Sequence, residues 1–181
     1  MRITGGILRG RKLKAPKGKK TRPTSDLVRE SLFNIIGLKI IKSVFLDAYA
    51  GSGAVGIEAL SRGASLAVFI DSSRNAVNSI RQNLMSLNLM DRSFVICDSV
   101  FRGLSKLVIS GYSFDIIFID PPYGKNQIQP CLELIQRAVL LKPDGLMVVQ
   151  SDVGDHYEHK GFLCSKTKKY GRTQISFLVR E

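Results

Sequence analysis

One short stretch, residues 44–56 (VFLDAYAGSGAVG), constrains the fold of this chain more than any other. Its apolar first half predicts a buried strand, and the glycines that follow predict a tight turn leading into a helix. Gly51, Gly53 and Gly56 match the pattern G-x-G-x-x-G, in which the first glycines let a ligand approach closely and the third allows close helix packing. The stretch therefore predicts an α/β domain with a ligand-binding first turn.

The acid within this stretch narrows the choice of ligand. Asp47 lies four residues before Gly51. A turn that holds a pyrophosphate at a helix N-terminus is disfavoured by a nearby anion, whereas S-adenosylmethionine carries a sulfonium and an ammonium and has no phosphate. We therefore interpret the turn as an S-adenosylmethionine site formed by Asp47, Ala50, Gly51 and Gly53. An NAD-type site is the alternative, and Asp47 disfavours it.

Strand and helix patterns alternate after the first strand. The nearly all-apolar strands predict a parallel sheet covered by helices on both faces, and the end of the chain predicts an antiparallel strand pair. A helix after Pro23, capped by Thr24 or Ser25 and stopped by Gly37, precedes them. We expect a doubly wound, seven-stranded, mostly parallel sheet of the Rossmann-like type. Its predicted strands are 44–49, 66–71, 94–97, 114–120, 146–150, 161–169 and 173–179, with helices to about 62 and over 74–87, 100–109 and 128–141.

Acidic residues follow the predicted strands, and ligands of such sheets bind at the carboxyl ends of the strands. Asp71 lies twenty residues beyond Gly51, where a carboxylate can accept both ribose hydroxyls. Asp98 is placed to accept from an adenine amino group. Acids at strand ends can also simply cap the next helix, and for Asp98 both interpretations stay open.

The sequence Asp120-Pro121-Pro122-Tyr123 predicts a stiff loop, because two prolines cannot continue a helix or a central strand. The Asp120 carboxylate and the Pro121 carbonyl can accept the hydrogens of an exocyclic amine on a flat base, and the Tyr123 ring can stack on that base. These acceptors direct the lone pair of the amine at a sulfonium methyl group. We interpret these four residues as a catalytic loop for in-line methyl transfer that depends on positioning and charge placement. A plain Pro-Pro turn is the alternative.

The net charge of +12 is unevenly distributed. Residues 1–22 hold nine basic residues and no acid, residues 160–181 hold six basic residues and one acid, and the middle holds 12 basic and 14 acidic residues. Blocks of one sign predict nucleic-acid contact rather than solubility alone. We expect residues 1–22 to form a small basic hairpin or arm that contacts RNA, with a frayed terminus as the alternative, and residues 23–181 to form the catalytic domain. The expected RNA contacts in the arm are Arg9, Arg11, Lys12 and Arg22.

The cysteines, the histidines and two further charged residues give weaker indications of function. Three widely spaced cysteines show neither disulfide nor zinc spacing, which favours a reducing compartment, and no apolar run has the length of a membrane span. His156 and His159 lack a third ligand and are interpreted as surface histidines, so we expect no metal. Arg29 is interpreted as a surface charge. Glu58 either supports the site or forms a surface pair.

The order of glycine turn, ribose acid and D-P-P-Y resembles the class I S-adenosylmethionine-dependent amino-methyltransferases. Residues 3–13, 22–34, 47–60 and 170–173 narrow this resemblance to the RsmD family. One departure is Asp71, where relatives often carry Glu and a further acid two residues on; Ser73 stands at that second position.

The resemblance implies methylation of the guanine N2 amine in bacterial 16S ribosomal RNA, of the guanine-966 type, with S-adenosylmethionine as cofactor. It also implies that Thr24 contacts the methionine end of the cofactor. We expect a monomer in the bacterial cytoplasm that acts on 16S rRNA or the small ribosomal subunit, without membrane contact. The alternatives are a DNA adenine-N6 or cytosine-N4 methyltransferase, which the missing target-recognition domain disfavours, and a non-catalytic RNA-binding protein.

Overall fold

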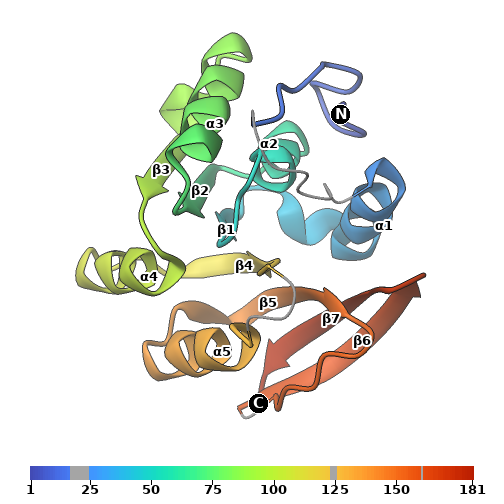
Figure 1. Cartoon of the computed structure of the whole chain (residues 1–181), viewed down its shortest axis with the longest axis vertical. Helices are drawn as coiled ribbons and strands as arrows, with labels where there is room; N and C mark the ends of the chain where they lie inside the picture. Colours follow the sequence, from blue (N-terminus) through green and yellow to red (C-terminus); the bar gives the residue numbers. More distant parts are fainter. Residues whose placement is uncertain (17–24, 123–125, 160) are drawn as a thin grey trace.

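A computed structural model describes residues 1–16, 25–122, 126–159 and 161–181 of the chain. In this part of the chain, seven strands form one sheet in the order β3-β2-β1-β4-β5-β7-β6 (Figure 1). The first five strands run parallel to their neighbours, and β7 is antiparallel to both β5 and β6. The strands are β1 Val44–Asp47, β2 Leu66–Asp71, β3 Ser93–Cys97, β4 Phe114–Ile119, β5 Leu141–Asp152, β6 Phe162–Tyr170 and β7 Thr173–Arg180.

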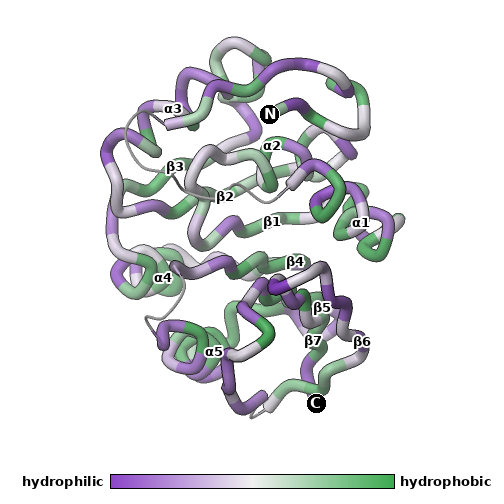
Figure 2. The backbone as a smooth tube through the Cα atoms, turned by 45° about the vertical axis from the view of Figure 1, so that its right-hand side comes forward, coloured by the Kyte–Doolittle hydropathy of each residue, from purple (hydrophilic) through white to green (hydrophobic). Residues whose placement is uncertain are grey.

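Helices cover both faces of this sheet, as the apolar strands predict. α1, α2 and α3 pack on one face, and α4 and α5 pack on the other (Figure 1). Figure 2 shows hydrophobic residues along the central strands and mixed character along the helices. The doubly wound fold is confirmed. The helices are α1 Asp26–Ile36, α2 Ala54–Ser61, α3 Arg74–Ser86, α4 Val100–Ile109 and α5 Ile128–Arg137, with short 3-10 turns at Gly37–Ile40 and Met90–Arg92.

Local signals explain most helix boundaries. The side chains of Ser25, Ser73 and Ser99 accept hydrogen bonds from backbone N–H groups in the first turns of α1, α3 and α4. Gly37 ends α1 with a φ of 57°, a conformation in which glycine is favoured. Thr24, the other predicted cap, lies outside the described residues.

The prediction for α5 and β5 was wrong at their junction. The helix ends at Arg137 rather than near Leu141, and Val139 takes a φ of 53°. β5 then begins at Leu141, which pairs with Phe114, and the register shifts so that Ile116 pairs with Leu146. Residues 142–145, which separate the predicted helix from the predicted strand, therefore lie in an irregular part of β5 itself.

The first sixteen residues pack against the domain instead of fraying. Arg2 and Lys12 form an isolated antiparallel bridge, so the predicted hairpin is reduced to one pair. Ile3 and Leu13 are buried in the same apolar cluster as the side chains of α1 and α2. Burial of two aliphatic side chains stabilises this segment by about 1.5–3 kcal/mol for each side chain. In the described residues, no helix has the length and apolar character needed to cross a membrane.

Candidate functional site

The strand order reverses between β1 and β4, which lie side by side and parallel at the centre of the sheet. From β1 the chain crosses to β2 on one side, and from β4 it crosses to β5 on the other. Such a switch point leaves a crevice at the carboxyl ends of the two strands. Asp47 is the last residue of β1 and Asp120 directly follows β4. The topology therefore brings these two predicted site residues to the crevice.

The glycine turn lies at the same edge, between β1 and α2. Gly51 and Gly53 have φ angles of 55° and 75°, a region that favours glycine. Asp71 holds the turn, because its carboxylate accepts from the backbone N–H of Gly51 at 2.7 Å and of Ser73 at 2.8 Å. A side chain added at Gly51 meets nothing within 4 Å, so the turn faces open space. Ala50 is buried beside it.

Gly56 has a different role from the other two glycines. A Cβ atom at this position would lie 2.3 Å from the ring of Phe69, which is fully buried in β2. The third glycine of the motif thus lets α2 pack tightly on the sheet, as the motif predicts. Close packing of α2 fixes the position of the turn that precedes it.

Asp47 is a buried carboxylate at this edge. Its side chain is 1% exposed, and Oδ2 accepts from the Gly56 N–H at 3.0 Å. The pKa of Asp47 is raised to about 7. Burial is the largest cause, the hydrogen bond from Gly56 opposes it, and the negative charges of Asp120 and Asp71 add to it. In the described part of the chain no lysine or arginine forms a salt bridge with Asp47. The three carboxyl groups of Asp47, Asp71 and Asp120 therefore form an acidic cluster that favours a cation.

The predicted catalytic loop begins where the sequence places it. Asp120 is half-buried, Pro121 is buried and Pro122 is exposed. Asp120 lies close enough to Asp47 to raise the pKa of that carboxyl group. Tyr123 falls outside the described residues, so its predicted stacking role stays a prediction.

Asp98 lies beside the site but is bound to the neighbouring helix. Its backbone N–H donates to the Asp71 carbonyl at 3.1 Å, so the two strand ends are adjacent. Its carboxylate contacts Lys106 Nζ of α4 at 2.9 Å, and this hydrogen bond, with one from the Ser99 N–H, lowers its pKa. The alternative that Asp98 caps α4 was wrong, because Ser99 is the capping residue and Asp98 binds Lys106 within that helix. Its role as an adenine contact stays a prediction.

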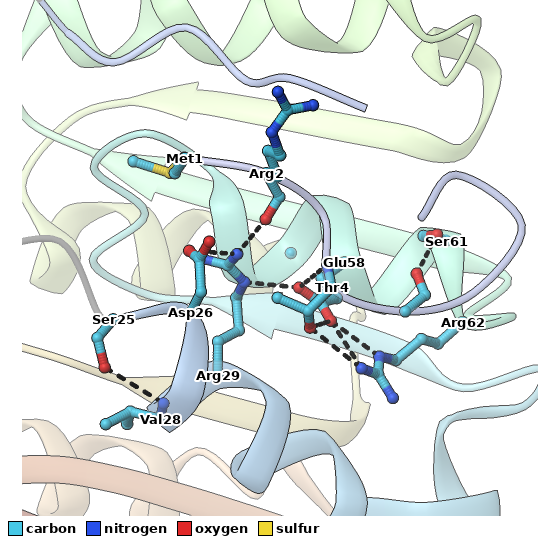
Figure 3. Close-up of polar contacts among 12 residues, drawn as sticks. Met1, Arg2, Thr4, Ser25, Asp26, Val28, Arg29, Glu58, Ser61 and Arg62 are labelled. Carbon is cyan, nitrogen blue, oxygen red and sulfur yellow. Dashed lines mark hydrogen bonds and ion pairs between the residues drawn. The ribbon is translucent and has the colours of Figure 1, made fainter. Parts of the chain in front are cut away.

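Sequence reasoning missed a buried polar network behind the glycine turn (Figure 3). Glu58 of α2 is fully buried and accepts from Arg29 Nε of α1 at 2.6 Å and from Arg62 Nη2 at 2.8 Å. Thr4 donates to the same carboxylate through both its backbone N–H and its hydroxyl. The interpretation of Arg29 as a surface charge was wrong, because its side chain is 0% exposed. The Glu58 carboxylate thus binds both the arm and α1 inside the protein, and it does not form a surface pair.

A second contact joins the arm to the glycine turn directly. Asn83 of α3 is buried and accepts from the Lys14 N–H at 2.9 Å. Its Nδ2 atom donates to the carbonyls of Lys14 at 3.0 Å and of Ser52 at 3.3 Å. The Ser52 hydroxyl also lies 3.4 Å from the sulfur of Met1. The helical pattern of α3 places Asn83 among buried positions, but only the tertiary structure shows what it bonds.

The predicted RNA contacts in the arm are accessible. Arg9, Arg11 and Lys12 are exposed, and none of them forms a salt bridge within the described ranges. Arg22 lies outside the described residues. Asn83 holds Lys14 beside the glycine turn, whereas Ile7 and Leu8, next to Arg9, contact Ser61 at the far end of α2. RNA contact by these side chains stays a prediction.

The remaining candidates lie apart from the crevice. His156 and His159 line an open cavity of about 680 Å³ beside α5, together with acidic residues of the segment that follows β5. Where the structure describes the chain, no group of three His, Cys, Asp or Glu side chains is placed to hold a metal ion. The cysteines are free: Cys97 and Cys164 are exposed and Cys131 is buried.

Comparisons with known proteins agree with this geometry. The family model described as Conserved hypothetical protein 95 matches residues 1–179. YlbH of Bacillus subtilis, named a candidate rRNA methyltransferase, is 40% identical over 184 residues, which cover 97% of each chain. Ribosomal RNA small subunit methyltransferase D of Escherichia coli K12 is 37% identical over 153 residues, covering 84% of this chain and 75% of that protein. The solved structure of yhhF of Escherichia coli, named a candidate methyltransferase, is 33% identical with a TM-score of 0.86, covering 100% of this chain and 98% of that one.

Proposed function

The chain belongs to the family described as Conserved hypothetical protein 95 and is a methyltransferase, and from this premise we propose that it methylates the N2 amine of a guanine in 16S ribosomal RNA. The resemblance to the RsmD family is confirmed by the family model and by the relatives named ribosomal RNA small subunit methyltransferase D. The target we propose is the guanine-966 position. Such a substrate corresponds to an enzyme of the bacterial cytoplasm.

One observation carries the proposal: the buried carboxyl group of Asp47 lies with Asp71 and Asp120 at the switch point of the sheet, next to an open glycine turn. Asp47 is almost fully buried without a salt bridge in the described part of the chain, and its pKa is raised to about 7. A cation bound nearby would stabilise the ionised form of this carboxyl group. S-adenosylmethionine fits these residues, and when bound it supplies an electrophilic methyl group next to a positive sulfur.

We assign the cofactor-binding roles from position. Gly51 and Gly53 let the ligand approach the backbone, and Asp71, which already orients the turn, accepts the ribose hydroxyls. Asp47 and Ala50, which are both buried, lie beneath the bound ligand. Asp98 is proposed as the adenine contact, and Thr24 as the contact to the methionine end.

The catalytic roles belong to the loop after β4. The Asp120 carboxylate and the Pro121 carbonyl accept the two hydrogens of the guanine amine, so its lone pair is directed at the methyl group. Pro122 stiffens the loop, and Tyr123 stacks on the flipped base. The exposed Arg9, Arg11 and Lys12, with Arg22, bind phosphates of the RNA.

The test is methyl transfer from radiolabelled S-adenosylmethionine to in vitro transcribed 16S rRNA, with duplex DNA as the competing substrate. We expect label in the RNA alone, and mass spectrometry should locate it on one guanine. Preferential labelling of the DNA would replace the proposal with a DNA amino-methyltransferase. Binding of RNA without binding of the cofactor would indicate a non-catalytic protein.

Removal of one acceptor gives a sharper test of the catalytic loop. We expect Asp120→Ala to lower kcat by about 10²–10³, by analogy with the loss of one hydrogen-bonding group that stabilises a transition state. Affinity for the cofactor, measured by calorimetry, should change much less. Asp115→Ala is the control and should retain its turnover, because Asp115 lies at the opposite end of β4 and binds Lys142 of β5. Near-normal turnover of Asp120→Ala would remove Asp120 from the mechanism.

A further inference from the structure

Strand β6 forms one edge of the sheet and carries lysines that the catalytic site does not use. It pairs with β7, and its residues from Leu163 to Lys169 are all exposed. Lys166, Lys168 and Lys169 lie in this strand, which contains no acid. None of the three forms a salt bridge with any residue in the described segments.

The pairing of β6 with β7 assigns each lysine to a face. Lys166 pairs with Phe177 and Lys168 pairs with Ile175, and directly paired residues place their side chains on the same face of a sheet. Phe177 and Ile175 belong to the apolar cluster that contains α1, α2 and α3. Lys166 and Lys168, the β6 lysine pair, therefore project from the face that α1 covers. Lys169 lies at the next position and projects from the opposite face.

The register also places the lysine pair at the height of the site. Ile119 pairs with Val149, so Asp120 stands level with Gln150 at the next position. Gln150 pairs with the β7 residue that lies opposite Lys168. Asp120 and Lys168 thus occupy one row across the sheet. Three strand spacings separate β4 from β6, a distance of about 14 Å.

Contacts at the end of β6 hold the lysine pair in this position. The Tyr170 hydroxyl forms a hydrogen bond with Ser31 of α1. In the turn that follows, Arg172 forms a salt bridge with Asp152 at 3.2 Å, and its carbonyl accepts from the Val153 N–H. The β6–β7 turn is therefore fixed at the same edge of the sheet as the crevice.

A basic surface flanks α1 on each side. The N-terminal arm, with Arg9, Arg11 and Lys12 exposed, lies on one side of α1, and β6 lies on the other (Figures 1 and 2). α1 itself presents the exposed acid Glu30 between them. A polyanion on this face is accordingly attracted to the two flanks and not to the middle.

From this arrangement we propose that Lys166 and Lys168 bind phosphates of the RNA substrate, as a second contact surface across the site from the arm. The inference rests on the proposed function, because it assumes that the target base enters the crevice at Asp120. Two contacts on opposite flanks fix the orientation of the RNA, which phosphate contacts do without reading sequence. Lysines on an edge strand can also serve to prevent strand pairing between molecules. Edge protection requires only that lysines lie on either face of β6. Phosphate binding requires them on the face that α1 covers, where Lys166 and Lys168 lie.

The test compares two double variants with the same change in net charge. Lys166→Gln/Lys168→Gln removes the β6 lysine pair, and Lys39→Gln/Lys42→Gln removes two exposed lysines before β1, at the opposite edge of the sheet. Binding of in vitro transcribed 16S rRNA is measured between 50 and 300 mM salt. For the β6 variant we expect the slope of log affinity against log salt to fall by about 1.4, since each single-stranded phosphate contact contributes about 0.7. The KM for RNA should rise with kcat and cofactor affinity unchanged.

The control variant and Lys169→Gln should keep the wild-type slope. Equal salt slopes for the β6 variant and the control variant would overturn the inference. If Lys169→Gln reduces the slope by as much per lysine as the β6 variant does, the lysines act through general charge or edge protection, and the inference also fails. The proposed function is tested separately by the wild type: if wild-type protein transfers no methyl group to rRNA, that function fails, whatever the binding slopes are.

Discussion

At the scale of single residues, the protonation of Asp47 should depend on whether a cation is bound beside it. Its pKa of about 7 in the folded protein lies well above the ordinary value of 3.8, so the folded protein holds this proton between those pH values. The unfolded chain releases it. The contribution of Asp47 to the free energy of unfolding is therefore greatest at low pH and is lost as pH rises through about 7.

Asp47→Asn removes this titration while keeping the shape of the side chain. We expect the variant to gain thermal stability relative to the wild type, and to gain more at pH 8 than at pH 5.5, because only the wild type buries a negative charge at pH 8. Melting temperatures of the ligand-free proteins measure the difference. A gain that does not change with pH would show that Asp47 does not titrate in this range.

Affinity for the cofactor should increase as pH rises, whereas the stability contributed by Asp47 decreases. A positive ligand favours the ionised form of Asp47, so wild-type affinity for S-adenosylmethionine should rise by about tenfold per pH unit below 7 and then level off. Calorimetry at pH 5.5, 6.5 and 7.5 measures this slope. Asp47→Asn should bind weakly with no such slope, and a slope equal to that of the wild type would mean that another group causes it.

At the scale of elements, Glu58 joins α2, α1 and the arm through one carboxylate. Arg29 and Glu58 are both fully buried, and breaking a buried pair leaves an uncompensated charge at a cost of about 3–5 kcal/mol. We expect Glu58→Gln to lower the free energy of unfolding by about this amount, measured by denaturant unfolding. Glu30→Gln on the exposed side of α1 is the control and should change it by less than about 0.5 kcal/mol. Equal effects of the two substitutions would mean that the network adds no stability.

At the scale of the whole molecule, the arm is part of the domain core as well as a basic surface. Ile3 and Leu13 are buried, Thr4 bonds to Glu58, and Lys14 is held by Asn83. Deleting residues 1–14 should therefore lower the melting temperature, because it uncovers apolar surface and leaves the Glu58 network incomplete.

Neutralising the arm without removing it separates the two roles. We expect Arg9→Gln/Arg11→Gln/Lys12→Gln to retain the wild-type melting temperature and cofactor affinity, because these side chains are exposed. Its affinity for 16S rRNA should fall, with a salt slope reduced by about 2. Unchanged RNA affinity in this variant would mean that the arm does not contact the substrate.

The sequence by itself determined the alternation of strands and helices, the glycine turn and the acids at the strand ends. These features depend on local chain conformation and on the periodicity of apolar residues, both of which are visible in order along the chain. The bounds of β2 and α4 agree with the prediction for this reason. The end of α5 was misplaced because apolar residues continue past it into β5, and periodicity does not separate a helix from a buried strand there.

Only the tertiary structure decided which polar residues are buried together. Arg29 and Glu58 are charged residues in helices, and nothing in their neighbours along the chain shows that they are fully buried and paired across 29 positions. The raised pKa of Asp47 likewise arises from burial and from Asp120 and Asp71, which the parallel sheet brings beside it. Burial and electrostatic interaction depend on distances in space, and these distances are set by the packing of elements that lie far apart in the sequence.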